Sequence, residues 1–366
     1  MQQVNTRRVI DTFLELVKIP SPSWKEDNVI RYIEKKASEF GYASERSACR
    51  DSWNLLVRIP GDESMKPLLF AAHTDTVTPC EKVVPVETGT KITSDGTSIL
   101  GGDDKAAVAA FIEAMEVLSS GEKNHPPVEF LFTCAEEVGL QGMKGMDYSK
   151  IRAKRAFVFD CSGSIGTMIL QAPSQIILKA EVTGKAAHAW IEPEKGLNAI
   201  RVLSEIISKL PDGRIDKETT ANVGIVAGGR ATNIVSEKAS FEMEMRSLSR
   251  TKLKALETKV VQIIKKTAAA KGAKVKVQST LEYSGFSIPV TDAIVKTVEQ
   301  AAARAKVKPV YSSSGGGSDT NVLNAKGIRA VNLSIGMSNV HTTKEFILKK
   351  DIIKGAELVL AIIASA

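Results

Sequence analysis

Short apolar runs, each several residues long and free of polar interruptions, constrain the fold of this chain more than any other feature. They occupy residues 68–72, 130–132 and 157–159. Such a run is typical of a strand buried on both faces, because a strand with one exposed face alternates apolar and polar residues. A helical pattern at 106–118 separates the first two runs. Strands that alternate with helices predict an α/β fold with parallel central strands.

The pattern changes near Gln175 and reverts near Ser284. Between these points the order is strand, helix, strand, strand, helix, strand, which is the ferredoxin-like α+β arrangement. The predicted elements are strands at 176–182, 222–226, 239–246 and 273–278 and helices at 198–210 and 251–270. Since 366 residues are many for one domain, we predict a discontinuous domain of residues 1–174 and 284–366 with an insert at 175–283.

The N-terminal part predicts two helices. Ser23 and Glu26 have the spacing of a capping box, in which each side chain bonds the backbone at the other residue. We therefore expect the second helix to begin there and to end near Gly41.

Composition excludes several classes of protein. The net charge of +7 is spread along helical faces and aromatic residues make up 5%, so we expect no nucleic-acid binding. No apolar run reaches the roughly 18 residues of a membrane span. The N-terminus has no signal-peptide pattern, which predicts a cytoplasmic protein. The four cysteines lack CxxC spacing, so a disulfide framework is not expected.

Acidic residues and histidines gather at the ends of predicted elements. His73, Asp75, Glu136, Glu137 and Asp160 come within a few residues after buried strands, Asp103 and Asp104 lie in a glycine-preceded turn that opens a helix, and His341 follows a later strand. Taken singly, Asp103 or Asp104 could cap a helix, and Glu136-Glu137 could form an exposed turn. Together they are expected at the edge of the sheet where the strands end, because ligands bind beyond the carboxyl ends of the strands in open α/β sheets.

Such a cluster needs cations. Two carboxylates 4 Å apart repel by about 4 kcal/mol at an effective dielectric constant of 20. Two divalent ions would balance Asp103, Glu137, Asp160 and one hydroxide while His73 and His341 stay neutral. Adjacent side chains of an extended segment point opposite ways, so one of the two glutamates can bind metal while the other acts as a base. Asp75 could orient the His73 ring.

Five motifs in order resemble the cocatalytic zinc exopeptidase family of peptidase T and carboxypeptidase G, closest to the peptidase T-like tripeptide aminopeptidases. They are Ala72-His73-Thr74-Asp75-Thr76, Leu100-Gly101-Gly102-Asp103-Asp104-Lys105-Ala106, Thr133-Cys134-Ala135-Glu136-Glu137-Val138-Gly139, Phe159-Asp160 and Val340-His341. The resemblance implies an α/β catalytic domain, with a mostly parallel mixed sheet between helices, interrupted by a ferredoxin-like lid and dimerisation domain.

The resemblance also implies a role for each residue of the cluster. His73 and Asp160 would hold one zinc ion, Glu137 and His341 the other, and Asp103 would bridge both and precede a cis peptide. Glu136 would be the general base, and Asp75 would support His73. Cobalt or manganese could replace zinc in such a mixed site.

In the insert, His188 matches a lid histidine that stabilises the oxyanion, typically in the active site of the partner subunit. Asn233 and Arg246 match substrate-binding positions, and a guanidinium suits a carboxylate. The glycine turn with Gly316 and Gly317, before a helix, could hold a substrate carboxylate or backbone.

The motifs and the resemblance together thus imply a homodimeric, dinuclear zinc peptidase that cleaves the N-terminal bond of short peptides, tripeptides in particular, by means of a metal-bridging hydroxide. A related carboxypeptidase, dipeptidase or N-acyl amino-acid deacylase is the alternative. A non-catalytic metal- or peptide-binding protein is the third hypothesis, and the presence of Glu136 argues against it.

Overall fold

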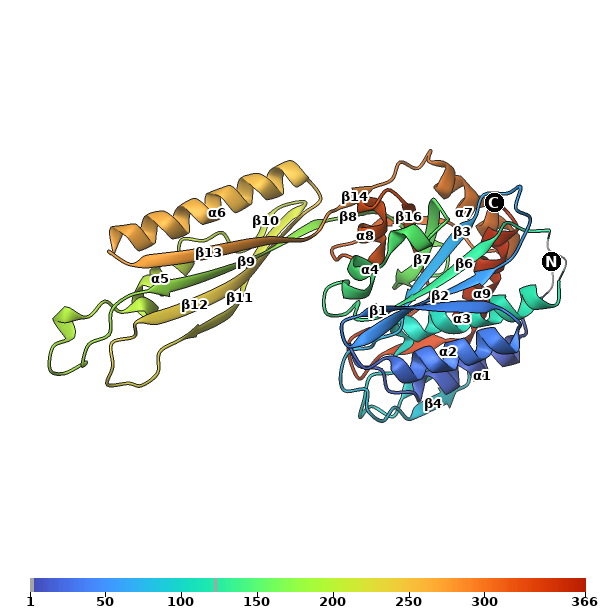
Figure 1. Ribbon diagram of the computed structural model, residues 1–366, viewed down its shortest axis with the longest axis horizontal. Coiled ribbons are helices and arrows are strands. Elements are labelled where there is room, and N and C mark those ends of the chain that lie inside the picture. The colour runs from blue at the N-terminus through green and yellow to red at the C-terminus, as the bar shows by residue number, and fades with distance from the viewer. Residues whose placement is uncertain (1–2, 122–123) are drawn as a thin grey trace. The chain divides into compact units, whose positions relative to one another are not determined.

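The computed structural model describes residues 3–121 and 124–366, which form two compact units. Unit 1 contains the chain up to Leu170 together with Ser287–Ser314 and Ser318–Ala366. Unit 2 contains Gln171–Phe286 and Gly315–Gly317. The chain therefore leaves unit 1 to build unit 2 and then returns to complete unit 1 (Figure 1).

The larger sheet contains nine strands of the described chain. They are β1 (Ala43–Cys49), β2 (Ser52–Ile59), β3 (Leu68–His73), β6 (Val128–Thr133), β7 (Arg155–Cys161), β8 (Thr167–Ala172), β14 (Phe286–Ser287), β15 (Val310–Ser313) and β16 (Arg329–Ser334). Their order is β1-β2-β6-β3-β7-β16-β8-β14, with β15 paired to β8. The four central strands β6, β3, β7 and β16 are parallel. Every residue of β3 and β6 is buried, as unbroken apolar runs predict.

Aromatic packing fixes the register of the central strands. Phe70 of β3 lies opposite Phe130 of β6 and Phe157 of β7, with ring centroids 5.5 and 5.3 Å away. Phe111 closes the cluster at 5.9 Å from Phe70. Because side chains alternate along a strand, this register also sets which groups stand at the carboxyl end, where His73 lies beside Thr133.

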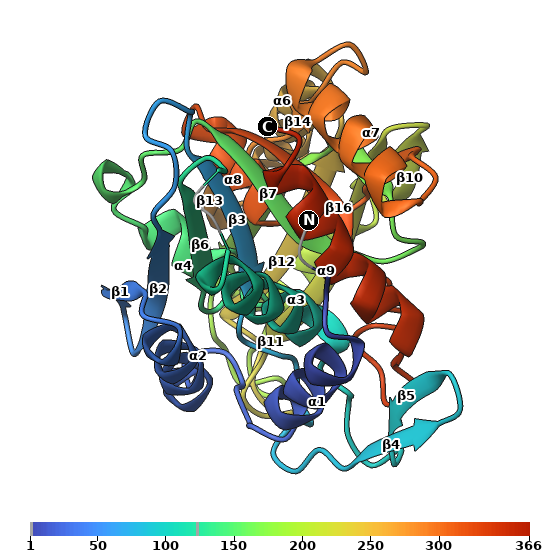
Figure 2. The same ribbon diagram turned by 90° about the vertical axis from the view of Figure 1, so that its right-hand side faces the viewer.

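Helices of unit 1 cover the sheet. They are α1 (Thr6–Val17), α2 (Asp27–Glu39), α3 (Gly102–Ser119), α4 (Gln141–Gly145), α7 (Ala293–Ala305), α8 (Asp319–Ala325) and α9 (Lys349–Ile363), with a 3-10 turn at Tyr148–Lys150. Almost all of α3 is buried, because it packs on β3 and against both α1 and α9 (Figure 2). A helix that is apolar on all sides belongs in such a central position.

A small three-stranded sheet was not predicted. It consists of β4 (Pro85–Thr88), β5 (Lys91–Ser94) and β17 (Phe346–Leu348), in the order β17-β5-β4. Its strands are short and partly exposed, so they lack the apolar pattern of a central strand. The sheet joins the segment before Asp103 to the segment after His341.

Unit 2 contains an antiparallel sheet and two helices. Its elements are β9 (Ser174–Thr183), α5 (Ala199–Ile207), β10 (Gly213–Asp216), β11 (Thr219–Gly228), β12 (Lys238–Ser247), α6 (Arg250–Ala270) and β13 (Lys274–Tyr283), with a 3-10 turn at Pro193–Lys195. The order is β10-β11-β12-β9-β13. Without the short edge strand β10, this is the predicted ferredoxin-like arrangement. Leu178, Phe241 and Val260 belong to its own hydrophobic core.

The predicted fold class is confirmed, with the parallel part of the mixed sheet limited to its four central strands.

The predicted capping box is wrong. The Ser23 hydroxyl donates to Asp75, and Glu26 accepts from the backbone of Trp24 and Ala135, while α2 begins at Asp27 without a side-chain cap. Distant partners have replaced the local capping bonds. Among the described residues, no helix has the length and apolar character needed to cross a membrane.

Candidate metal centre

His73 ends β3 and faces two carboxylates. Its Nε2 lies 3.0 Å from Oδ1 of Asp103 and 4.0 Å from Oδ1 of Asp160. Its Nδ1 lies 2.9 Å from the backbone oxygen of Asp75 and 3.5 Å from the Asp75 carboxylate. An acceptor at Nδ1 favours the proton on that nitrogen, which leaves Nε2 as the free ligand atom.

Asp103 stands between two histidines. It lies in the first turn of α3, where Asp103 and Asp104 depart from helical geometry and the peptide bond between them is cis. While Oδ1 of Asp103 faces His73, Oδ2 lies 3.2 Å from Nε2 of His341. One carboxylate thus presents one oxygen to each imidazole, which is the geometry of a bridging ligand.

Glu137 completes the side of the cluster around His341. Its Oε1 lies 3.0 Å from Nε2 of His341. The contact has the length but not the alignment of a hydrogen bond, so this buried oxygen has no hydrogen-bond partner among the described residues. An unsatisfied buried carboxylate oxygen is costly unless a cation or donor reaches it.

These positions fit metal binding. Ligand atoms of His73, Asp103 and Glu137 all lie within 4.8 Å of one another. Two overlapping groups share Asp103: His73 with Asp160, and His341 with Glu137. Imidazole nitrogens and carboxylate oxygens are the ligands that zinc takes when cysteine is absent. The cluster is therefore a candidate metal site.

The electrostatics of the cluster also call for positive charge. Burial, with a contribution from Asp160, raises the pKa of Glu136 well above its usual range. Burial and then Asp103 do the same to the pKa of Asp160. The contacts with Asp103 and Glu137 raise the pKa of His341 to about 10. The cluster thus holds more carboxylates than it can keep ionised without added cations.

Asp75 does more than face His73. This fully buried carboxylate accepts the backbone N–H groups of Glu136 (2.9 Å) and Glu137 (3.2 Å) and the Ser23 hydroxyl (2.7 Å). It therefore fixes the short segment that carries both glutamates. This segment follows β6 and begins at Ala135, which has a positive φ of 49°.

Two further carboxylates near the cluster were missed by the sequence analysis. Glu26, fully buried, accepts the Ala135 N–H at 2.9 Å. Asp319, 2% exposed, accepts the Thr133 hydroxyl at 2.6 Å, and burial raises its pKa to about 6. Nothing in the local sequence marks Glu26 as other than a helix cap. Asp319 directly follows Ser318 and the glycine turn, and this position beside a predicted substrate-binding turn was the signal that could have identified it.

His188 and Asn233 lie together in unit 2. The backbone N–H of Ala189 donates to the backbone oxygen of Asn233 at 3.0 Å, and His188 pairs with Ile234 as an isolated bridge. The N–H groups of Trp190 and Ile191 donate to Nδ1 of the exposed His188 ring at 3.2 and 3.3 Å. The neutral ring therefore carries its proton on Nε2.

Arg246 and the glycine turn also lie together in unit 2. The Arg246 guanidinium donates to the Gly315 oxygen at 3.1 Å and to Glu244 at 2.9 Å. A Cβ on Gly317 would lie 2.4 Å from the Tyr283 ring, so the turn packs tightly there and requires glycine. Gly316 lies between these two contacts. The metal cluster belongs to unit 1, and these predicted substrate-binding residues belong to unit 2.

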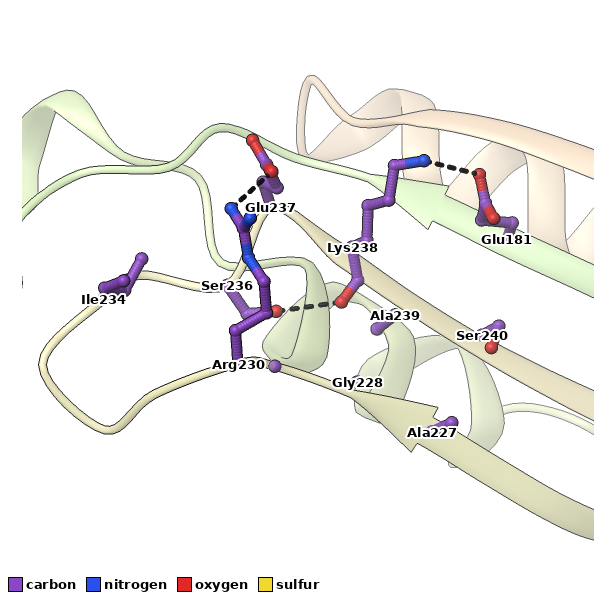
Figure 3. Close-up of a pocket in the computed structure, with 11 residues that line it drawn as sticks. Glu181, Ala227, Gly228, Arg230, Ile234, Ser236, Glu237, Lys238, Ala239 and Ser240 are labelled. Atoms are coloured by element: carbon purple, nitrogen blue, oxygen red, sulfur yellow. Dashed lines mark hydrogen bonds and ion pairs between the residues drawn. The ribbon is translucent and has the colours of Figure 1, made fainter.

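A hollow of about 420 Å³ lies elsewhere in unit 2 (Figure 3). Its charged groups pair with one another: Arg230 with Glu237 at 2.7 Å, and Lys238 with Glu181 at 3.6 Å. The Ser236 hydroxyl donates to the Lys238 backbone oxygen at 2.9 Å. Because its charged groups already have partners, and none of the cluster residues line it, the hollow adds nothing to the candidate metal centre.

Comparison with known proteins decides the family. The peptidase dimerisation domain profile matches residues 175–272, and the peptidase family M28 profile matches residues 54–189. Peptidase T from a Clostridium perfringens strain is 30% identical over 75% of this chain and 68% of its own length. Among solved structures, aminopeptidase PepT from Bacillus cereus has a TM-score of 0.90 and 37% identity, with 99% of each chain covered. A Staphylococcus aureus tripeptidase has a TM-score of 0.92 and 33% identity, covering 99% of this chain and 98% of its own.

The chain belongs to the peptidase T family. It is a metallopeptidase, and the resemblance inferred from its motifs is confirmed. Within this family, the cluster of His73, Asp103 and Glu137 is the candidate metal site of the enzyme. The insert is its dimerisation domain.

The contacts of Asp75 generate a first prediction. In Asp75→Asn, one carboxylate oxygen becomes an NH2 group that must face a donor, so the Glu136-Glu137 segment loses part of its support. We expect peptidase kcat/KM to fall about 10- to 100-fold, the usual effect of removing a supporting contact in a metal site. The matched control is Asp62→Asn, an exposed aspartate whose carboxylate accepts from Ser64, and this variant should leave kcat/KM unchanged. Wild-type kcat/KM in Asp75→Asn would contradict the role of Asp75.

Proposed function

We propose that this peptidase uses two divalent metal ions to hydrolyse the N-terminal peptide bond of short peptides, tripeptides in particular. One observation carries the proposal: Asp103 presents an oxygen to His73 on one side and to His341 on the other. Two ligand groups that share a carboxylate are the arrangement expected of a two-metal site.

The ligand assignment follows from the contacts. His73 and Asp160 would hold one ion, His341 and Glu137 the other, and Asp103 both. When bound, the ions would supply Lewis-acid chemistry, polarising the scissile carbonyl and lowering the pKa of water. Zinc suits these ligands, and cobalt or manganese could take its place.

Glu136 is the proposed general base. Its backbone is held by Asp75, whereas its neighbour Glu137 faces His341. Burial favours its proton-bound form once a proton has been taken up. It would accept the proton of the attacking water and transfer it to the leaving amine.

The dimerisation domain supplies the remaining groups of the proposal. Nε2–H of His188 is available to donate to the oxyanion of the tetrahedral intermediate, in the active site of the partner subunit of a homodimer. Asn233 lies beside it. Arg246, with Gly316 and Gly317 next to its Gly315 contact, would bind the substrate carboxylate or backbone.

Substrate length and the required terminus are tested by a panel of peptides. We expect the metal-loaded enzyme to cleave free-amine tripeptides well, and N-acylated or longer peptides poorly. Initial rates measured by chromatography of the products check this and identify the bond cleaved. Stronger cleavage of N-acylated substrates or release of the C-terminal residue would contradict the aminopeptidase assignment and favour a deacylase or a carboxypeptidase.

The base is tested by Glu136→Ala. We expect kcat to fall by several orders of magnitude, because proton transfer is lost, while the metal content measured by elemental analysis stays at the wild-type value. The control is Glu137→Ala, which should lose metal as well as activity. Retained turnover in Glu136→Ala would remove the base assignment.

The role of His188 in the partner subunit is tested by mixing two inactive variants. His188→Ala and Glu136→Ala should each be nearly inactive alone. Co-refolded, they should regain activity, because in a mixed dimer one active site receives an intact His188 from the subunit that lacks Glu136. If the mixture stays as inactive as its components although size-exclusion chromatography shows dimers, His188 does not act across the interface.

A further inference from the structure

Glu345 is a buried carboxylate that the proposed mechanism does not use. It is 1% exposed. Its Oε2 accepts the backbone N–H groups of Leu100 (2.9 Å) and Gly101 (2.8 Å), and its Oε1 accepts that of Asp103 (3.0 Å). Glu345 is separated from Asp103 by 242 residues in sequence, so it ties together two distant segments.

The first of these segments is the turn that carries Asp103. Here the backbone departs from helical geometry, so its N–H groups cannot all find partners within α3. Glu345 supplies acceptors for three of them. A Cβ on Gly102 would lie 3.0 Å from Oε1 of Glu345, which leaves little room for a side chain. The turn and the carboxylate therefore fit closely.

The second segment is the loop that carries His341. Ser338 and Phe346 close it at its base through two backbone hydrogen bonds of 3.0 Å. Inside the loop, the Thr342 hydroxyl donates to the backbone oxygen of Asn339, and the backbone N–H of Glu345 donates to the backbone oxygen of Thr342. His341 itself has a positive φ of 63°. Because the loop is braced internally, fixing Glu345 at its base also fixes His341.

The position of Glu345 is set by the small sheet. Phe346, the next residue, begins β17 and pairs with Thr93 of β5. The same β5 leads along the chain to Leu100 and Gly101. The carboxylate is thus held from both sides by backbone pairing and by its three donors.

We propose that Glu345 is a positioning residue that sets the distance between Asp103 and His341, and with it the affinity for the metal ion these two ligands share. The inference rests on the proposed function, in which Asp103 and His341 bind one ion. Through its hydrogen bonds, Glu345 would maintain the 3.2 Å separation between Oδ2 of Asp103 and Nε2 of His341. Both oxygens of Glu345 are needed, because each serves different donors.

The test compares two buried glutamates whose carboxylates both accept backbone N–H groups. Glu129 is 2% exposed and accepts the N–H groups of Arg152 (3.1 Å) and Ala153 (3.0 Å), away from the candidate metal site. Glu345→Gln and Glu129→Gln each keep the side-chain volume but turn one oxygen into an NH2 group. Both metal-free variants should therefore have a lower unfolding midpoint than the wild type.

Metal affinity separates the two variants. Calorimetric titration of the metal-free proteins with zinc should show two ions binding to the wild type and to Glu129→Gln with the same affinities. In Glu345→Gln, the affinity for one ion should fall about 10- to 100-fold. At limiting zinc, kcat should fall in Glu345→Gln alone, and excess zinc should restore it.

Unchanged zinc affinities in Glu345→Gln, with an unfolding midpoint as low as that of Glu129→Gln, would overturn the proposal and leave Glu345 a purely structural residue. If Glu345→Gln does not fold, Glu345→Asp, which is too short to reach all three donors, decides the same question. Binding of one zinc ion to the wild type would overturn the two-metal proposal. A weaker affinity for that single ion in Glu345→Gln would still support the positioning role.

Discussion

Negative charge buried at one sheet edge is the constraint on which the rest of the structure depends. Asp103, Glu136, Glu137 and Asp160 gather with two imidazoles where the parallel strands end. Two carboxylates 4 Å apart repel by about 4 kcal/mol at an effective dielectric constant of 20, so such a cluster is unfavourable without cations. The aromatic core around Phe70 provides the rigid support that holds these groups together, because the register of β3, β6 and β7 determines which side chains reach this edge.

A second set of carboxylates surrounds the first and serves the backbone instead. Asp75 and Glu26 bind N–H groups of the segment that carries Glu136 and Glu137, and Glu345 binds those of the turn that carries Asp103. The segment of Glu136 and Glu137 lies outside the helices and strands, and the Asp103 turn departs from helical geometry, so the backbone groups of both need such partners. The enzyme thus uses carboxylates in two ways: in the candidate metal site as proposed ligands and base, and one layer further out as acceptors for loop backbone.

Sequence reasoning succeeded where the signal is local and periodic. The unbroken apolar runs predicted strands β3, β6 and β7. The change near Gln175 from unbroken to alternating apolar residues predicted the α+β insert. His73, Glu137 and Asp160 lie at or just after the end of a predicted strand, because strand ends follow directly from the apolar pattern, whereas Asp103 lies in the first turn of α3. The roles of Glu26 and Glu345 could not be predicted, since each depends on a partner more than a hundred residues away. Glu26 was assigned to a helix cap for the same reason, because the local sequence shows only neighbouring residues and does not show that Ala135 donates to Glu26.

The position of β16 has a consequence for biosynthesis. This strand lies between β7 and β8 in the sheet but follows both in the chain, after the whole of unit 2. On the ribosome, β7 and β8 emerge long before the strand that joins them, so β7 exposes an unpaired edge until residue 334 has been made. His341 emerges later still. A nascent or truncated chain that stops before residue 329 therefore lacks the strand that joins β7 and β8, and one that stops before residue 341 lacks part of the candidate metal site.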